Sequence, residues 1–206
     1  MKKNFFEFSD KILSASDAAM KKAALKFAEI DEITEYNQQK VLAAFIHNRV
    51  SEADFAGSTG YGYGDRGREK LDSIYAEAFG AEDAIVRHSF TCGTHTLFVA
   101  LFGLLRPGVT KNCLTGKPHA TIHSVIDPSG SGMGSLKDFG VKYEQVELNS
   151  NGLPDLPAIE KALEKKPRMV YIQRSRGYSL RPSLSVAQIS EIAARVKSKC
   201  DAIVMV

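Results

Sequence analysis

Hydrophobic residues recur at helical spacing over the first part of the chain. The spacing predicts one helix over residues 10–30 and a second helix that Thr34 can cap. A loop dense in glycine follows at residues 57–67, and a third helix is predicted over residues 69–79, closed by Gly80. We therefore expect the chain to begin with a helical arm. The apolar positions that define its first two helices are Ile12, Leu13, Ala19, Ala23, Phe27, Val41, Leu42, Phe45 and Ile46.

From residue 84 onward, short apolar runs alternate with helical patterns. Strands are predicted at residues 84–87, 113–115, 142–148, 169–173 and 202–206, and helices at residues 94–105, 121–126, 156–164 and 186–198. Such alternation indicates a parallel sheet covered by helices on both faces. The sequence therefore predicts an α/β fold, a three-layer sandwich with a mostly parallel sheet. Its predicted domains are an N-terminal helical segment, residues 1–56, and an α/β domain, residues 57–206.

The last six positions, residues 201–206, have the composition of a buried parallel strand, and the sequence stops there. In open α/β sheets, ligands bind just beyond the carboxyl ends of the strands. A short terminal strand is one interpretation of this ending. The interpretation we favour is a truncated chain that stops before its catalytic machinery is complete.

Composition and charge narrow the class of protein. The 206 residues carry a net charge of +3, with Lys and Arg mixed among Asp and Glu. Because there is no basic block, we expect neither a nucleic-acid partner nor a membrane partner. The N-terminus lacks a secretory-signal pattern, and no apolar run reaches the ~20 residues of a membrane helix. Three widely spaced cysteines imply neither a disulfide framework nor a zinc knuckle, so we expect a cytoplasmic protein.

The glycine-rich loop contains Gly62-x-Gly64-x-x-Gly67, the spacing of a dinucleotide-binding fingerprint. That fingerprint requires an apolar strand in front of it, and residues 51–55 do not form one. The sequence also lacks the Gly-Lys-Ser/Thr ending of a P-loop. A connecting loop is therefore the favoured interpretation, although its two tyrosines and its arginine could present donors to a phosphate.

Residues 92–95 are a stronger candidate for a binding site. Cys92, Gly93 and Thr94 stand where an apolar helix begins, and free N–H groups at a helix N-terminus favour a phosphate. Simple capping by Thr91 or Thr94 is the alternative. If these residues hold a phosphate, their N–H groups should face an open cavity.

Two further groups of residues follow strands or share a helix face. Arg174 and Arg176 come directly after a predicted strand and could bind a carboxylate or phosphate, or could lie in a solvated loop. His119 and His123 are four apart, but a metal site needs three or four ligands and no acidic or cysteine partner lies nearby in sequence. We therefore predict no metal site.

Taken together, these residues resemble the pyridoxal-phosphate enzymes of fold type I, and within them the methionine gamma-lyase-like, or aluminium-resistance, proteins. The resemblance covers nearly the whole chain from Phe45 onward. The segments that carry it are residues 58–63, 65–68, 80–84, 86–87, 92–95, 101–103, 105–108, 115–118 and 173–178.

The resemblance implies a pyridoxal 5'-phosphate site. Gly93 and Thr94 match the family's Ser-Gly-Thr phosphate loop, with Cys92 in the place of the serine. His119 stands where the family has a tyrosine that stacks on the pyridine ring, so the resemblance implies that it faces the same cavity as Gly93 and Thr94. Tyr63 and Arg66 match the Tyr and Arg that related lyases lend to the cofactor phosphate of a neighbouring subunit, which implies a homodimer or homotetramer at full length.

The same resemblance implies that two catalytic groups are absent from these 206 residues. They are the aspartate that keeps the ring nitrogen protonated and the lysine that forms the Schiff base, which in the family follow the last strand present here. We therefore expect the N-terminal part of a carbon–sulfur lyase acting on an amino acid, inactive by itself. The alternatives are a non-catalytic protein that binds a phosphate ligand and an inactive fragment.

Overall fold

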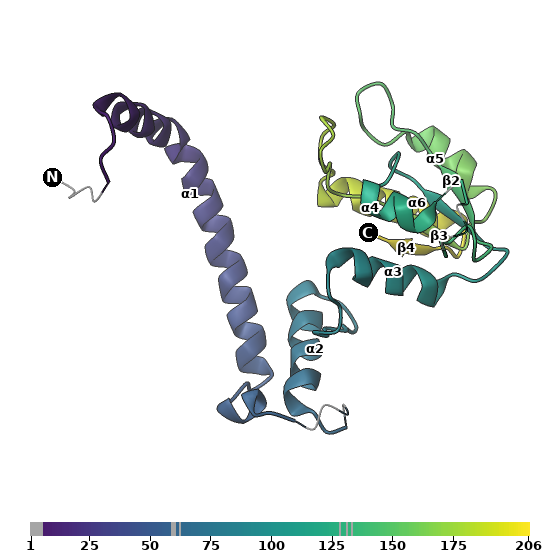
Figure 1. The fold of residues 1–206 in the computed structure, drawn as a ribbon, viewed down its shortest axis with the longest axis horizontal. Helices are drawn as coiled ribbons and strands as arrows, with labels where there is room; N and C mark the ends of the chain where they lie inside the picture. Colours follow the sequence, from purple (N-terminus) through teal and green to yellow (C-terminus); the bar gives the residue numbers. More distant parts are fainter. Residues whose placement is uncertain (1–5, 59–60, 62, 128, 131, 133) are drawn as a thin grey trace. The chain divides into compact units, whose positions relative to one another are not determined.

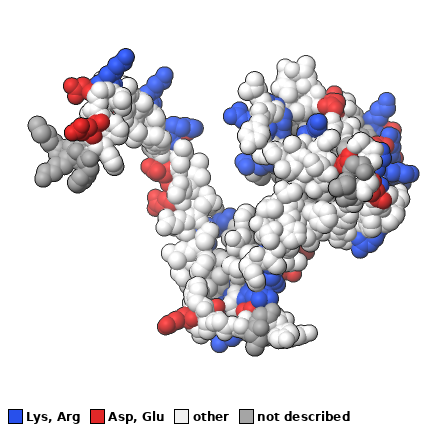
Figure 2. Space-filling model, in the orientation of Figure 1, with Lys and Arg blue, Asp and Glu red and all other residues white. Residues whose placement is uncertain are grey.

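The computed structural model describes residues 6–58, 61, 63–127, 129–130, 132 and 134–206. The chain divides into two compact units, the first ending at Ser89 and the second beginning at Phe90 (Figure 1). The domain boundary expected at residue 57 stays a prediction. Lys or Arg and Asp or Glu side chains both occur on the surface of each unit (Figure 2). No helix among the described residues is long and apolar enough to cross a membrane.

The first unit contains one long helix where the sequence indicated two. Helix α1 runs without a break over Asp10–His47. Thr34 does not cap a second helix, because its Oγ1 donates a hydrogen bond to the carbonyl oxygen of Ile30 at 2.8 Å, one turn earlier in the same helix. A threonine inside a helix commonly makes this bond. The prediction of two helices is therefore wrong.

A short 3₁₀ helix, η1 (Glu52–Phe55), and helix α2 (Arg66–Phe79) complete the first unit. Asp65 caps α2 by accepting the Arg68 N–H, and Gly80 closes the helix in the left-handed conformation, as predicted. Gly67 lies so close to η1 that a Cβ atom on it would stand 2.1 Å from the Asp54 carbonyl oxygen. The last glycine of the fingerprint spacing therefore serves close packing within this unit. Gly62 lies outside the described residues.

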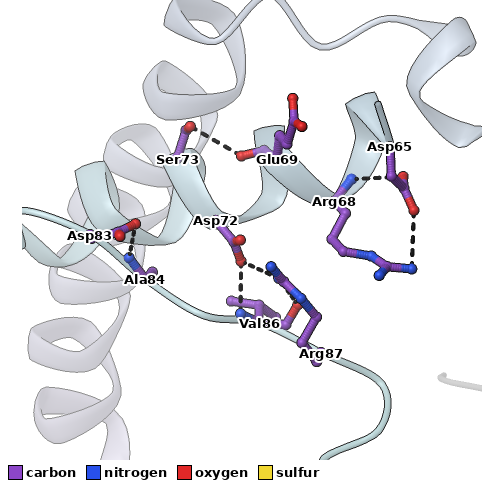
Figure 3. Close-up of polar contacts among 9 residues, drawn as sticks. All are labelled: Asp65, Arg68, Glu69, Asp72, Ser73, Asp83, Ala84, Val86 and Arg87. Atoms are coloured by element: carbon purple, nitrogen blue, oxygen red, sulfur yellow. Dashed lines mark hydrogen bonds and ion pairs between the residues drawn. The ribbon is translucent and has the colours of Figure 1, made fainter. Parts of the chain in front are cut away.

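The strand predicted at residues 84–87 does not form. Asp72 of α2 holds this segment instead, because its Oδ1 accepts the Val86 N–H at 2.8 Å and an Arg87 guanidinium N–H at 2.7 Å (Figure 3). The arginine and the peptide N–H lower the pKa of Asp72 below its ordinary value. A side-chain carboxylate thus takes the N–H group that a neighbouring strand would bind. The apolar composition of the segment was a misleading signal.

The second unit is a four-stranded parallel sheet with helices in the connections (Figure 1). Its strands are β1 (Thr110–Cys113), β2 (Lys142–Gln145), β3 (Met169–Tyr171) and β4 (Ile203–Met205), in the spatial order β2-β1-β3-β4. The helices are α3 (Gly93–Leu104), α4 (Ala120–Ile126), α5 (Leu156–Leu163) and α6 (Val186–Lys199). The parallel arrangement allows the chain to bring several strand ends to one edge.

Two hydrophobic layers lie on opposite faces of the sheet and confirm the three-layer α/β prediction. The α5/α6 layer contains Leu114, Val146, Ile159, Leu163, Val170, Ile172, Leu184, Ile192, Val196 and Ala202. The α3/α4 layer contains Leu101, Leu105, Cys113, Ile122, Ile126, Leu136, Val141, Met169 and Tyr171. Residues of β3 alternate between the layers, as the pleat of a strand requires.

Strand β1 begins three residues earlier than the sequence indicated. The prediction was residues 113–115, whereas the strand is Thr110–Cys113. Lys111 and Asn112 are polar and yet buried, so a search for runs of hydrophobic residues does not detect this strand. The other three strands start within a residue of the prediction and end earlier than it.

Candidate cofactor and substrate site

The loops that follow β1, β2 and β3 border an open cavity of about 660 Å³, here called the strand-end cavity. Its position beyond the carboxyl ends of parallel strands is where open α/β sheets bind ligands. Both basic and acidic groups reach it, with the basic ones in excess. It is lined by Thr115, Gly116, Lys117, Pro118, His119, Ala120, His123, Ser124, Glu147, Leu148, Gln173, Arg176, Tyr178, Ser179 and Arg181.

His119 stands at the wall of this cavity as the N-cap of α4. Its backbone N–H donates to Gln173 Oε1 at 2.6 Å, and its ring Nδ1 lies 3.1 Å from Thr121 Oγ1. The ring centroid is 5.9 Å from that of Tyr178. A Cβ atom on Gly177 would stand 2.9 Å from His119 Cδ2, so the following loop packs directly against the imidazole. The position of the imidazole is therefore fixed by the hydrogen bond of the His119 backbone and by the contact of Gly177 with the edge of the ring.

Gln173 joins the ends of β1 and β3. Its N–H donates to Thr115 Oγ1 at 2.9 Å, and its side-chain amide donates to the Ser175 carbonyl oxygen at 3.0 Å while accepting from His119. Three hydrogen bonds on one residue fix the orientation of the cavity wall. The sequence offered Gln173 only as part of a motif and assigned it no role.

Arg181 closes the loop after β3 onto itself. Its guanidinium donates to the carbonyl oxygens of Gln173 at 3.1 Å, Ser175 at 2.7 Å and Pro182 at 3.0 Å. Burial lowers the pKa of Arg181 from its ordinary value. Sequence reasoning missed this residue, because its partners are backbone carbonyls that only the folded loop brings within reach.

The two predicted substrate-binding arginines lie differently in this loop. Arg176 lines the strand-end cavity, and neither its side chain nor that of Lys117 makes a hydrogen bond or ion pair among the residues that the structure describes. Arg174 is exposed and does not line the cavity. Its carbonyl oxygen accepts the Leu184 N–H at 3.1 Å. Arg176 and Lys117 are thus the cations available to an anion there.

Helix α3 begins at Gly93, one residue before the predicted start, and its N-cap is Cys92 and not Thr91 or Thr94. The Cys92 Sγ accepts the His95 N–H at 3.4 Å, a capping contact that a serine hydroxyl would also make. In the described part of the chain, no acceptor is bonded to the N–H groups of Gly93 and Thr94. A Cβ atom on Gly93 would meet nothing within 4 Å, so the approach to these donors is open.

Thr94 and His119 line two hollows and not the single cavity that we expected. Thr94 borders a hollow of about 450 Å³ that Ser124 shares with the strand-end cavity. We call it the hydroxyl hollow. It is lined by Thr94, Phe98, Thr121, Ser124, Val125, Gly134 and Ser135. The α4 residue Ser124 therefore marks the place where the two hollows meet.

Tyr63 and Arg66 belong to the first unit, and their predicted roles stay predictions. The Tyr63 side chain is 90% exposed, and that of Arg66 is 68% exposed. Arg66 Nε lies 3.9 Å from Asp54 Oδ1, while Asp54 Oδ2 accepts from Lys70 Nζ at 2.6 Å. Hydrogen bonds from Lys70 and Ser51 lower the Asp54 pKa to about 2. The Arg66 side chain thus lies near the Asp54 carboxylate, which Lys70 holds in place, and most of it is open to solvent.

The histidine pair also reaches the strand-end cavity. His119 and His123 lie one turn apart at the start of α4, and both line it. Within the described ranges, no three His, Cys, Asp or Glu side chains come together as a metal site would require.

The comparisons with known proteins assign the class of protein. The pyridoxal-5'-phosphate-dependent protein YhfS from Escherichia coli has this fold, with a TM-score of 0.61 over 82% of this chain and 43% of its own. At 19% identity that likeness shows the fold alone. The family model described as Methionine gamma-lyase matches residues 12–206, and the chain belongs to this family.

Two more similar relatives are considerably longer than this chain. A carbon–sulfur lyase involved in aluminium resistance from Clostridium novyi NT is 44% identical with a TM-score of 0.88, over 96% of this chain and 47% of its own. The uncharacterised protein YnbB of Bacillus subtilis (strain 168) is 43% identical over 170 residues, 82% of this chain and 40% of its own. This chain therefore spans less than half the length of either relative.

Proposed function

We propose that this chain provides the cofactor-binding part of a pyridoxal-phosphate-dependent carbon–sulfur lyase that acts on an amino acid. The observation that carries the proposal is the strand-end cavity beyond three parallel strands. A fixed imidazole and two cations, neither paired with any other described residue, face this one space. Family membership supports a lyase-like enzyme. The substrate and the reaction are part of the proposal.

The residues present fit a phosphate-bearing cofactor. The free N–H groups of Gly93 and Thr94 stand at the N-terminus of a twelve-residue helix, where the helix dipole and unpaired donors favour an anion. The Thr94 hydroxyl, which borders the hydroxyl hollow, adds a donor of the kind that phosphate oxygens accept. Gly93, without a side chain, allows the phosphate to approach the backbone.

His119 would lie against the aromatic ring of the cofactor. An imidazole offers a flat face for stacking, as the family's tyrosine does. Gln173 and Gly177 hold the backbone and ring edge of His119, so its orientation is set before any ligand arrives. Such preorganisation lowers the entropy cost of binding.

The cations of the cavity would bind the amino-acid substrate. Arg176 offers a planar fork that matches a carboxylate, and Lys117 adds a second positive charge. When bound, pyridoxal phosphate supplies an electron sink for the negative charge that develops at the substrate's Cα. The residues of this chain hold and orient the reactants, and we assign none of them a proton transfer.

Assembly with a second copy of the chain is part of the same proposal. Tyr63 and Arg66 project from the first unit into solvent, as residues that serve a neighbouring subunit's cofactor phosphate would. We therefore propose a homodimer or homotetramer of the full-length protein. Sedimentation of that protein, with and without Arg66→Ala, tests whether the arginine affects cofactor retention in the assembled form.

Titration of the 206-residue chain with pyridoxal phosphate, followed by visible absorbance, tests the cofactor assignment. We expect saturable binding that inorganic phosphate competes away. Thr94→Val should weaken it about tenfold, since one hydrogen bond to a charged group is worth about 1.5 kcal/mol or more. Thr96→Val is the matched control on the same helix, because its hydroxyl already donates to the Cys92 carbonyl oxygen. Equal affinities of the two variants, or no saturable binding, would contradict the assignment.

Two further measurements separate the enzyme from the alternatives. Borohydride reduction of the 206-residue chain with pyridoxal phosphate should leave no single lysine labelled, because no lysine here matches the family's Schiff-base motif. The full-length protein should release a keto acid from a sulfur-containing amino acid. Cofactor binding without any elimination product would favour the non-catalytic phosphate-binding alternative.

A further inference from the structure

Strand β1 carries a lysine that the proposed function does not use. Lys111 is 0% exposed, and Cys113, two residues further, is 1% exposed. Residues two apart on a strand share one face of the sheet, and for this pair it is the face covered by α3 and α4. Lys111 lies opposite Tyr143 of β2, and Cys113 lies opposite Tyr171 of β3. The pair is therefore enclosed by neighbouring strands.

The amine and the thiol face each other, and the Tyr143 hydroxyl is a further hydrogen-bond partner of the thiol. Lys111 Nζ is 3.4 Å from Cys113 Sγ, and it stands 4.5 Å from the Tyr171 ring centroid and 5.8 Å from that of Tyr143. Among the described residues, no carboxylate forms an ion pair with Lys111. Burying an amine in this way is costly unless it is neutral or stabilised by its neighbours. A buried lysine with a thiol as its hydrogen-bond partner is an arrangement that packing alone does not require.

We propose that Lys111 and Cys113 are an oxidative modification site, at which hydrogen peroxide joins Nζ to Sγ by a covalent bond. In the first step, the Cys113 thiol and one peroxide molecule give a sulfenic acid and one water. In the second, the Lys111 nitrogen attacks sulfur, the S–O bond breaks, and the hydroxyl leaves with an amine proton as a second water. The sulfur is oxidised by two electrons, one peroxide is reduced, and the product is a sulfenamide.

Distance and protonation both favour the second step. The two atoms that must join already lie in hydrogen-bond contact, so the reaction needs no backbone movement of the strand. Burial lowers the pKa of the Lys111 amine, which raises the share of the neutral, nucleophilic form. Burial also raises the pKa of the Cys113 thiol, which slows the first step. The exposed Cys92 should therefore oxidise before Cys113 does.

The test uses the 206-residue chain with Cys92→Ser and Cys200→Ser, which leaves Cys113 as its single thiol. After exposure to hydrogen peroxide, the intact mass should fall by two hydrogen atoms, and dithiothreitol should restore it. Tryptic digestion should no longer cut after Lys111, and fragmentation should find residues 111 and 113 joined. A link that retains one oxygen between nitrogen and sulfur would also support the pair as the site.

A second variant separates the pair from simple thiol oxidation. In Lys111→Met, whose side chain is apolar and of similar length, Cys113 should gain two or three oxygen atoms and should not be recovered by dithiothreitol. If the parent chain itself gains these oxygens while trypsin still cuts after Lys111, the proposal is wrong. It is equally wrong if peroxide leaves Cys113 reduced or yields only disulfide-linked dimers. Even if Lys111→Met fails to fold, the peptide map of the parent chain shows whether residues 111 and 113 become linked, and so tests the proposal.

Discussion

The two units of this chain are held together by different interactions. In the second unit, two hydrophobic layers enclose the sheet, and most of their members are almost fully buried. In the first unit, Ala44 is the one buried residue of the 38-residue helix α1. Carboxylates provide much of the remaining contact there, through Asp54, Asp65 and Asp72. Packing therefore dominates the stability of the second unit, whereas charge and close backbone contact matter more in the first.

The largest effect should come from the hydrophobic layer between α5 and the sheet. Ile159→Ala removes a side chain that is fully buried in the α5/α6 layer. We expect it to lower the free energy of unfolding of the second unit by about 2–5 kcal/mol, since it leaves a cavity. Hydrogen exchange of the β1 and β3 amides measures this. Ile33→Ala in α1, where the side chain is 62% exposed, should change stability by no more than about 0.5 kcal/mol.

The next largest effect should come from close backbone packing in the first unit. Gly67→Ala would place a Cβ atom 2.1 Å from the Asp54 carbonyl oxygen, so α2 and η1 must separate. Overpacking of this kind costs about 1–3 kcal/mol. Gly57→Ala is the matched control, because nothing lies within 4 Å of its Cβ and its φ is ordinary. Equal protease resistance of the two variants would show that the close contact is not needed.

Acid should loosen the first unit through Asp54. Its folded pKa is lowered from 3.8 to about 2, so the ionised carboxylate stabilises the fold above pH ~4. That contribution is lost as the pH falls from 4 through the folded value of about 2. Limited proteolysis around residues 49–58 should therefore increase across this window. Asp54→Asn should remove this pH dependence of proteolysis. If the variant keeps the same pH dependence, a group other than Asp54 causes it.

The smallest effect should come from an exposed ion pair of the second unit. Lys165 Nζ lies 2.9 Å from Glu144 Oε1, but the lysine side chain is 65% exposed and the glutamate side chain 36% exposed. Lys165→Ala should cost about 0–1 kcal/mol in a denaturant titration, and less at high salt. A loss as large as that of Ile159→Ala would show that charge, and not packing, dominates the second unit as well.

The elements that the sequence predicted well are those with local signals. Helices α5 and α6 begin at Leu156 and Val186, directly after the capping residues Asp155 and Ser185, and their apolar faces follow helical spacing. The failures have non-local causes. Strand β1 was predicted at the wrong residues because Lys111 and Asn112 are polar but buried. Residues 84–87 do not form the predicted strand, because the Asp72 carboxylate binds the Val86 N–H.

The candidate site shows the same division between local and non-local signals. Arg176 was predicted from its position after a strand and His119 from the family resemblance, and both line the strand-end cavity. The roles of Gln173 and Arg181 depend on a loop that folds back over several residues, which no spacing rule describes. That Thr94 and His119 line different hollows depends on how α3 and α4 pack, so the sequence could not predict it.

The pairing of strands in the second unit has a consequence for folding during synthesis. The central strand β1 pairs Asn112 with Val170 of β3 and with Glu144 of β2, so neither edge of β1 is satisfied until much later segments exist. Closing such long loops is slow compared with forming a helix, and nascent chains expose unpaired strands in the meantime. Helices α1 and α2, by contrast, need only local contacts and can form as soon as they leave the ribosome. We expect chaperone dependence to begin once β1 emerges and to decrease once β3 has been synthesised.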